Sequence, residues 1–192
     1  MSASDKNAAT VAACYPWVGL ILDYTEEIAE LVPEDKLEWR LPDPSGKWHF
    51  SLAEIIMHSA DARIMFARQL SGNESTVGYW STGPGQDGVW SFRPYGSRQE
   101  ILDSLKSARA ELRPWLEQPV SAAMETTEGT RRLFGKALAG MKEKEQDTAA
   151  VELRGPANIV RVLMACIAHE SGHRGTLQTL LRVHGINASN RE

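Results

Sequence analysis

The sequence predicts an all-α protein, a four-helix bundle in which long crossover loops join the helices. Four segments repeat apolar residues at steps of three and four, the period of a helix with one buried face. Two of these segments begin with a capping sequence, and proline or glycine bounds the other two. We therefore expect helices over residues 8–32, 51–70, 97–117 and 156–184, in a single domain that covers residues 1–192.

The first helix is expected to begin near Ala8 and to end at Val32. Pro33 follows, and the residue before a proline is disfavoured in helical conformation. The buried face of this helix is defined by apolar residues at helical spacing: Val11, Cys14, Tyr15, Val18, Leu22, Tyr24, Ile28 and Leu31.

The second and third helices each begin with a capping box. The Ser51 hydroxyl can accept a hydrogen bond from a free backbone amide while Glu54 reaches back to the start of the helix. Ser97 and Glu100 repeat the same spacing before the third helix. Gly72 is expected to end the second helix because glycine tolerates the left-handed conformation found after helix ends.

The fourth helix is expected to begin at Gly155-Pro156, which places proline at the first helical position. It runs to His184, and Gly185 then suits a left-handed cap. The charged stretch over residues 119–154 predicts a partly helical insertion before this last helix.

The connection over residues 71–96 is rich in Gly, Trp and Tyr and is too long for a simple link between two helices. Loops of this length tend to be functional. Two interpretations of its aromatic residues stay open, namely the wall of an apolar pocket or local core packing: Tyr79, Trp80, Trp90 and Tyr95.

The overall composition is that of a soluble globular protein, with 42% hydrophobic and 24% charged residues. A net charge of -4 argues against nucleic acid as a partner, because nucleic-acid binders usually carry a strong basic surplus. No run of about 18 apolar residues is present, so we expect no membrane-spanning helix and no membrane partner.

The N-terminus and the cysteines favour a cytoplasmic protein. The residues before Cys14 are polar and include Asp5, so they lack the apolar stretch of a secretory signal. Cys14 and Cys166 both lie in apolar helical stretches and are expected to be buried free thiols rather than a disulfide.

The stretch HESGH in the fourth helix carries the clearest chemical motif. His169 and His173 are four residues apart, so their side chains lie on one face of a helix, about 6 Å apart along its axis. Two imidazoles at this spacing can bind one metal ion. A pair of this kind also occurs without a metal, so a third ligand decides its role.

The same stretch fits the H-E-x-x-H motif of zincin metalloproteases, in which Glu170 would be the general base. The longer version of that motif requires glycine and histidine where this chain has Thr176 and Thr179. A downstream carboxylate ligand is not available either, because only Glu192 at the end of the sequence remains. We therefore do not expect a zincin protease.

His58 is the best candidate for the third ligand. It lies in the second helix within an otherwise apolar string, where a lone histidine is more often a core residue than a ligand. The histidine pair changes this interpretation, because bundle cores build metal sites from side chains on facing helices. The remaining histidines, His49 and His184, lie too far from these positions and are expected to be solvated or to cap a helix.

Two long stretches of this chain resemble the DinB/YfiT-like four-helix bundles. They are DKLEWRLPDPSGKWHFSLAEIIMHSADARIMFARQL and HESGHRGTLQTLLR, which contain a W-R-P-like loop, a histidine in the second helix and an H-x-x-x-H-R-G-x-L motif in the fourth. The resemblance covers all four predicted helices. The resemblance implies a divalent metal, usually nickel or zinc, bound by His58, His169 and His173. The chain departs from the pattern at Leu41, where proline is expected, and in the insertion at 119–154.

The resemblance also implies a function. Family members with known activity include thiol-dependent transferases and isomerases, and homodimers are frequent. We expect a divalent-metal-dependent enzyme that acts on a small electrophilic molecule, with a low-molecular-weight thiol or an activated water as the nucleophile. The alternatives are a non-catalytic bundle with a structural metal that serves as a binding module, and an interaction module without metal.

Two carboxylates near the histidines are candidates for supporting roles. Glu170 could be a general base, or it could face water or pair with Arg174 at the i+4 position. Asp61 lies one turn beyond His58 and could accept its second imidazole proton, or it could form a surface ion pair.

Overall fold

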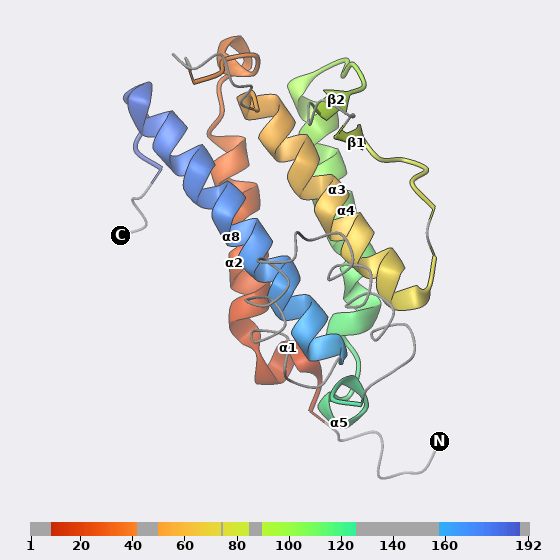
Figure 1. The fold of residues 1–192 in the computed structure, drawn as a ribbon. Helices are drawn as coiled ribbons and strands as arrows, with labels where there is room; N and C mark the ends of the chain where they lie inside the picture. Colours follow the sequence, from red (N-terminus) through yellow and green to blue (C-terminus); the bar gives the residue numbers. More distant parts are fainter. Residues whose placement is uncertain (1–8, 42–49, 74, 85–89, 126–157, 189–192) are drawn as a thin grey trace, which may run out of the picture.

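The computed structural model confirms the all-α bundle (Figure 1). Its four long helices are α2 (Pro16–Glu30), α3 (Leu52–Ser71), α4 (Arg98–Leu116) and α8 (Ile159–Val183). The structure describes residues 9–41, 50–73, 75–84, 90–125 and 158–188.

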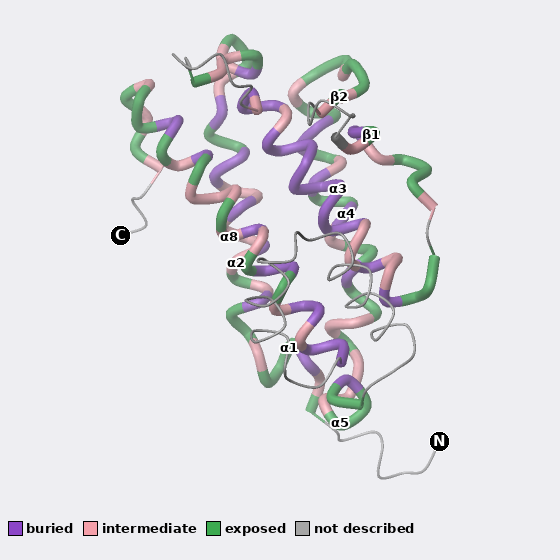
Figure 2. The backbone as a smooth tube through the Cα atoms, viewed as in Figure 1, coloured by how far each residue is buried: buried purple, intermediate pink, exposed green. Residues whose placement is uncertain are grey.

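Each long helix packs against two others, in the cyclic order α2, α8, α3, α4. In Figure 1, α2 and α8 run in one direction, and α3 and α4 run in the other. The helices that carry the three candidate ligands, α3 and α8, are therefore antiparallel neighbours. Buried residues lie along the inward faces of the four helices (Figure 2).

The first predicted helix is broken into two. A short helix α1 (Val11–Cys14) ends at Tyr15, and α2 begins at Pro16. Tyr15 has φ -127° and ψ 61°, outside the helical region, because the ring of Pro16 disfavours helical backbone in the residue before it. The expectation of one continuous helix over 8–32 is wrong for this reason.

The start of α3 agrees with the capping box predicted at Ser51. The Ser51 hydroxyl accepts a 3.2 Å hydrogen bond from the amide of Glu54, and the Glu54 carboxylate accepts a 2.9 Å bond from the amide of Ser51. The same carboxylate forms an ion pair with Arg40. Gly72 ends the helix with φ +74°, as predicted.

The start of α4 is capped by Ser97, whose hydroxyl accepts a 3.1 Å bond from the amide of Glu100. The Glu100 carboxylate accepts a bond from the amide of Gly96 at 2.6 Å, one residue earlier than the predicted capping box would place it. A 3-10 turn, η2 (Glu34–Lys36), lies between α2 and α3.

Helix α8 begins later than predicted. Asn158 caps it by accepting a 2.9 Å bond from the amide of Arg161, so the helix starts at Ile159 rather than at Pro156. The predicted left-handed cap at Gly185 is confirmed by its φ of +74°. Of the predicted insertion at 119–154, the structure describes a short helix, α5 (Val120–Ala123); residues 126–154 lie outside the described part.

The connection over residues 71–96 is a true crossover. Because α3 and α4 run in the same direction, the chain must return along a helix of about 30 Å before α4 can begin. Near its end it forms a small antiparallel hairpin, β1 (Ser81–Pro84) and β2 (Trp90–Phe92), in which Ser81 pairs with Phe92. The sequence reading did not predict these strands.

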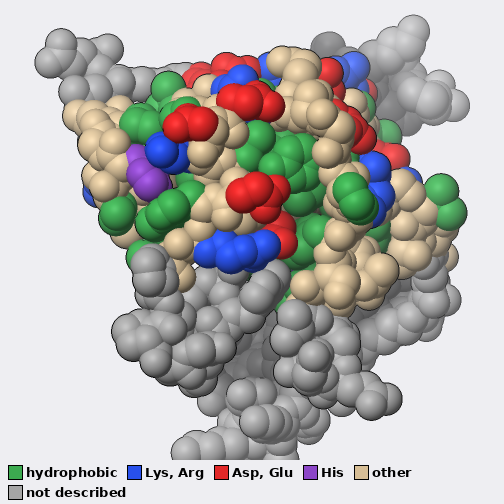
Figure 3. Space-filling model, turned by 90° about the horizontal axis from the view of Figure 1, so that it is seen from above, with side chains coloured by type: hydrophobic (Ala, Val, Ile, Leu, Met, Phe, Trp, Pro, Cys, Tyr) green, Lys and Arg blue, Asp and Glu red, His purple; other side chains and the backbone are tan. Residues whose placement is uncertain are grey.

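The core consists of two hydrophobic clusters, one towards each end of the bundle. Cys166 is buried in one of them, whereas Cys14 is exposed, so the expectation that both thiols are buried is wrong for Cys14. Both cysteines are free, as predicted. Seen from above, hydrophobic side chains gather near the centre of the described surface, and acidic and basic side chains lie around them (Figure 3). None of the described helices is long and apolar enough to cross a membrane.

The Ser51→Ala substitution should lower the free energy of unfolding by about 1 kcal/mol, because an amide at the start of α3 loses its partner. Urea denaturation followed by circular dichroism measures this change. The matched control is Ser71→Ala at the other end of α3, where the hydroxyl donates to a backbone carbonyl in an exposed position. Equal losses in both variants would contradict the capping role.

Candidate metal centre

The structure brings His58, His169 and His173 together between α3 and α8. Their ring centroids are 5.2 Å apart for His58 and His169, 4.8 Å for His58 and His173, and 4.5 Å for His169 and His173. Each ring offers one nitrogen to a group in which all candidate ligand atoms lie within 4.8 Å of one another. Among the described residues, this is the one such group of histidine, cysteine and acidic side chains.

The nitrogen positions fit a divalent ion. The Nε2 atoms of His169 and His173 are 3.0 Å apart, close to the roughly 3.3 Å between two nitrogens of a tetrahedral zinc site. A hydrogen bond between the two rings would give a similar distance. The surroundings of His58 support a metal ion over a mere hydrogen bond between the other two rings. The Nδ1 atom of His58 is buried without a hydrogen-bond partner among the described residues, and buried polar atoms normally have a partner.

The electrostatics of the site keep the imidazoles neutral. Burial, together with the smaller effect of the neighbouring His169, lowers the pKa of His58 to about 4. Burial and the two neighbouring rings lower the pKa of His173 to about 3. Burial also lowers the pKa of His169, against the opposite effect of Glu170. Neutral rings present the lone pairs that a metal requires, so these histidines suit metal binding near neutral pH.

Aromatic rings border the three histidines. Phe50 stacks on His58 at 5.2 Å, and Trp90 of β2 meets the same imidazole edge-on at 4.7 Å. Phe92 packs against both Phe50 and Trp90, while Phe66 lies 6.4 Å from His169 on another side. The hairpin of the crossover therefore supplies part of the surroundings of the site.

Of the aromatic residues singled out in the crossover, only Trp90 contacts a candidate ligand. Trp80 is a core residue, 2% exposed, whose indole donates to the hydroxyl of Ser104 at 2.6 Å. The Tyr95 hydroxyl donates to Glu38 at 2.5 Å, and Tyr79 packs against the core. Sequence reasoning overlooked Phe50, although its place directly before the Ser51 cap puts it two helical turns from His58.

Asp61 does not serve His58. Its carboxylate accepts bonds from the amides of Trp80 and Ser81 at 2.7 and 2.8 Å, and from the Ser81 hydroxyl at 2.7 Å. Asp61 is 4% exposed, so the alternative of a surface ion pair is also wrong. Its function is to anchor the start of the hairpin that carries Trp90.

Glu170 faces the core instead of solvent. It is fully buried, and its Oε1 atom accepts bonds from Nε and Nη2 of Arg63 at 3.1 and 2.5 Å. The expectation that it faces water or pairs with Arg174 is therefore wrong. A general-base role for Glu170 stays a prediction, and its carboxylate has a structural partner.

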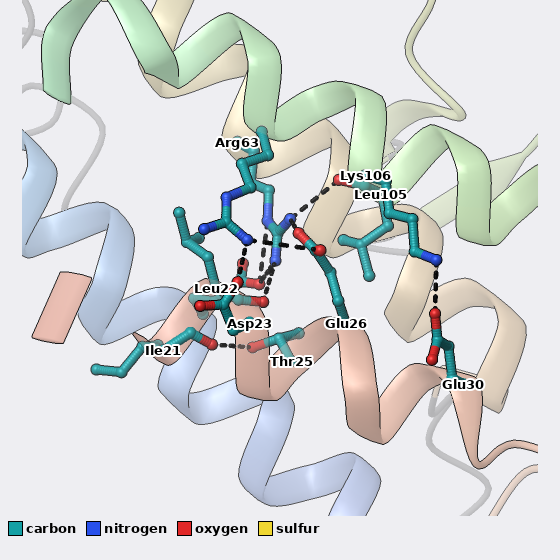
Figure 4. Close-up of polar contacts among 11 residues, drawn as sticks. Ile21, Leu22, Asp23, Thr25, Glu26, Glu30, Arg63, Leu105 and Lys106 are labelled. Carbon is teal, nitrogen blue, oxygen red and sulfur yellow. Dashed lines mark hydrogen bonds and ion pairs between the residues drawn. The ribbon is translucent and has the colours of Figure 1, made fainter. Parts of the chain in front are cut away.

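Arg63 lies at the centre of the bundle, with no exposed side-chain surface (Figure 4). Besides Glu170, its guanidinium donates to the Glu26 carboxylate at 2.6 Å and to the carbonyl of Leu105 at 2.9 Å. A fifth bond, of 3.3 Å, reaches the carbonyl of Leu22. Sequence reasoning missed this residue, although a charged side chain in the apolar string around His58 was a visible signal.

The two remaining histidines are not part of the centre. His184 caps α8 and packs edge-on against Trp39 at 4.3 Å. His49 lies outside the described residues.

The His58→Ala variant should bind a divalent ion at least about 100-fold more weakly than the wild-type protein, because two imidazoles from one helix remain. Titration of the metal against a chromophoric chelator measures this affinity. His184→Ala is the matched control, since it removes an imidazole from the end of α8 and should leave the affinity unchanged. Unaltered binding by His58→Ala would remove His58 from the site.

The metal-free protein should lose stability as the pH falls from about 6.5 towards 4. Histidines in the unfolded chain take up protons near their ordinary pKa of 6.5, whereas His58 and His173 in the folded state stay neutral to about 4 and 3. Acidification therefore favours the unfolded state across this window.

Thermal unfolding in the presence of a chelator measures this effect. The variant with both His58→Asn and His173→Asn should show a smaller decrease in melting temperature between pH 7 and 5 than the wild-type protein. The same decrease in both proteins would show that these imidazoles are not desolvated.

Comparison with known proteins supports the same assignment. The family model of the DinB superfamily matches residues 21–177, a range that includes all three histidines and all or part of each long helix. No curated protein and no solved structure matches the chain. Because the match covers most of the sequence and the fold is the expected helical bundle, the chain belongs to the DinB superfamily.

Proposed function

We propose that this protein is a metal-dependent enzyme in which His58, His169 and His173 hold a divalent ion, zinc or nickel. Its substrate is a small electrophilic molecule, and its reaction is the transfer of a low-molecular-weight thiol, a thiol-dependent isomerisation, or hydrolysis. The observation that carries the proposal is the convergence of three neutral imidazoles from two helices within 4.8 Å.

The number of ligands favours a catalytic site over a structural one. Structural zinc sites are closed by four protein ligands, whereas catalytic sites use three and leave a position for water or substrate. Among the described residues, no fourth histidine, cysteine or carboxylate joins the group. The nearest candidates along α8 are engaged elsewhere, since Cys166 lies in the core and Glu170 pairs with Arg63.

A divalent ion held by three imidazoles supplies Lewis acidity and lowers the pKa of a thiol or a water beside it. The protein's own residues complete the site. The depressed pKa values of His58 and His173 keep their lone pairs available near neutral pH. Phe50 and Trp90 cover one side of His58 with apolar surface, which limits access of bulk water and favours substrates with apolar groups.

The arrangement does not favour a protease. The hydroxyls of Thr176 and Thr179 donate to the carbonyls of Gly172 and Gly175, at 3.1 and 2.9 Å, within α8 itself. Both threonines are exposed, so the positions that complete the longer zincin motif do not face the other two histidines. The homodimer and the cytoplasmic location expected from the sequence stay predictions.

A screen of small electrophiles, with and without low-molecular-weight thiols, tests the proposal. The zinc- or nickel-loaded protein should turn over at least one electrophile, and His173→Ala should abolish that turnover because the ligand set is broken. His184→Ala should retain it. Turnover only with a thiol identifies a transferase or isomerase, and turnover without one identifies a hydrolase.

Bound metal with no turnover across the screen would contradict the catalytic proposal. It would favour the alternative in which the ion joins α3 to α8 and the bundle serves as a binding module. That alternative also requires a fourth protein ligand or the absence of exchangeable water, which a relaxation measurement on the manganese-loaded protein detects.

A further inference from the structure

The guanidinium of Arg63 joins all four helices of the bundle. An arginine side chain has five N–H groups, and each of the five hydrogen bonds of Arg63 can use a separate one. The acceptors lie on α2, α4 and α8, while Arg63 itself belongs to α3. Figure 4 labels the acceptors on α2 and α4, namely Leu22, Glu26 and Leu105. The position of α3 relative to its neighbours therefore depends on one planar, fully bonded group.

This group lies beside the metal centre. Arg63 follows His58 by five residues on α3, about 7.5 Å along the helix axis, and Glu170 follows His169 directly on α8. The bonds between Arg63 and Glu170 thus connect the two helices that carry the ligands. A shift of α3 along α8 that separates His58 from the histidine pair would break them.

Stability alone does not account for such a group. A buried ion pair loses so much hydration that apolar residues of similar volume are often as stabilising or more so. The Oε2 atom of Glu170 is also buried and has no hydrogen-bond partner among the described residues. The protein therefore keeps the Glu170 carboxylate, whose hydrogen bonding is incomplete, directly next to the candidate ligand His169.

We propose that Arg63 and Glu170 are positioning residues of the metal centre: their ion pair fixes α3 against α8 so that His58 meets His169 and His173. This inference rests on the proposed function. The negative charge of Glu170, on the residue that directly follows His169, also favours a cation at this site.

The test separates positioning from folding by comparing three variants. Glu170→Gln keeps the shape and one acceptor but removes the charge, and Arg63→Lys keeps the charge but loses the planar fork. The double variant Arg63→Met with Glu170→Leu removes both charges and leaves the core apolar. Glu26 then keeps Arg109 as a partner, at 3.7 Å.

Two controls complete the set. Leu112→Ala removes buried contacts of α4 in the hydrophobic cluster that contains Cys166, and it leaves the ion pair intact. Lys106→Gln removes the exposed ion pair between α4 and Glu30 of α2. Each protein is measured for its unfolding transition, for zinc affinity by chelator competition, and for the visible spectrum of its cobalt form, which reports ligand geometry.

We expect Glu170→Gln and Arg63→Lys to bind zinc about 10- to 100-fold more weakly than wild type and to shift the cobalt spectrum. The double variant should be more stable to unfolding than the two single variants, but it should bind zinc as weakly as they do. Both controls should bind zinc as wild type does, including Leu112→Ala, which unfolds more easily.

The inference is overturned if Glu170→Gln and the double variant bind zinc as wild type does, or if Leu112→Ala loses the same affinity as Glu170→Gln. If wild type itself binds no zinc, nickel or cobalt, the proposed function fails as well, so the two failures are distinguishable. If Arg63→Lys does not fold, Glu170→Gln and the double variant still decide the outcome.

Discussion

The arrangement of the bundle and of its metal centre depends on one buried guanidinium on α3, whose hydrogen bonds reach the three other long helices. Arg63 reaches α2 through Leu22 and Glu26, α4 through Leu105, and α8 through Glu170. Apolar packing between helices tolerates small shifts, whereas five directed hydrogen bonds in a dry core do not. A metal site divided between two helices needs that restriction, because ligand positions must be correct to a fraction of an ångström.

The candidate metal centre combines this fixed frame with desolvated rings. Burial lowers the basicity of the three histidines, so near neutral pH protons do not compete for the nitrogens that converge between α3 and α8. Asp61 holds the start of the hairpin through two backbone amides, and the hairpin places Trp90 against His58. The connection between α3 and α4 therefore also covers part of the candidate metal centre.

Local signals in the sequence predicted much of the fold and the pair His169 and His173. His58 was predicted from that pair on a different helix and from the family resemblance, not from its own neighbours. The cap at Ser51 and the spacing of the histidine pair depend on neighbours within four residues, which a single sequence displays. The break at Pro16 is equally local, but the apolar repeat continues through it and therefore predicts one continuous helix. The partner of Glu170 could not be predicted, because Arg63 is 107 residues away and only tertiary packing brings them together. The family model supports the fold independently.

X-ray absorption spectroscopy of the zinc-loaded protein tests the central claim most directly, because it counts and identifies the atoms bound to the ion. The structure predicts three imidazole nitrogens at about 2.0–2.1 Å and one further light atom that exchanges with solvent. Two or fewer imidazoles, a sulfur at about 2.3 Å, or a fourth ligand supplied by the protein would contradict an open three-histidine centre.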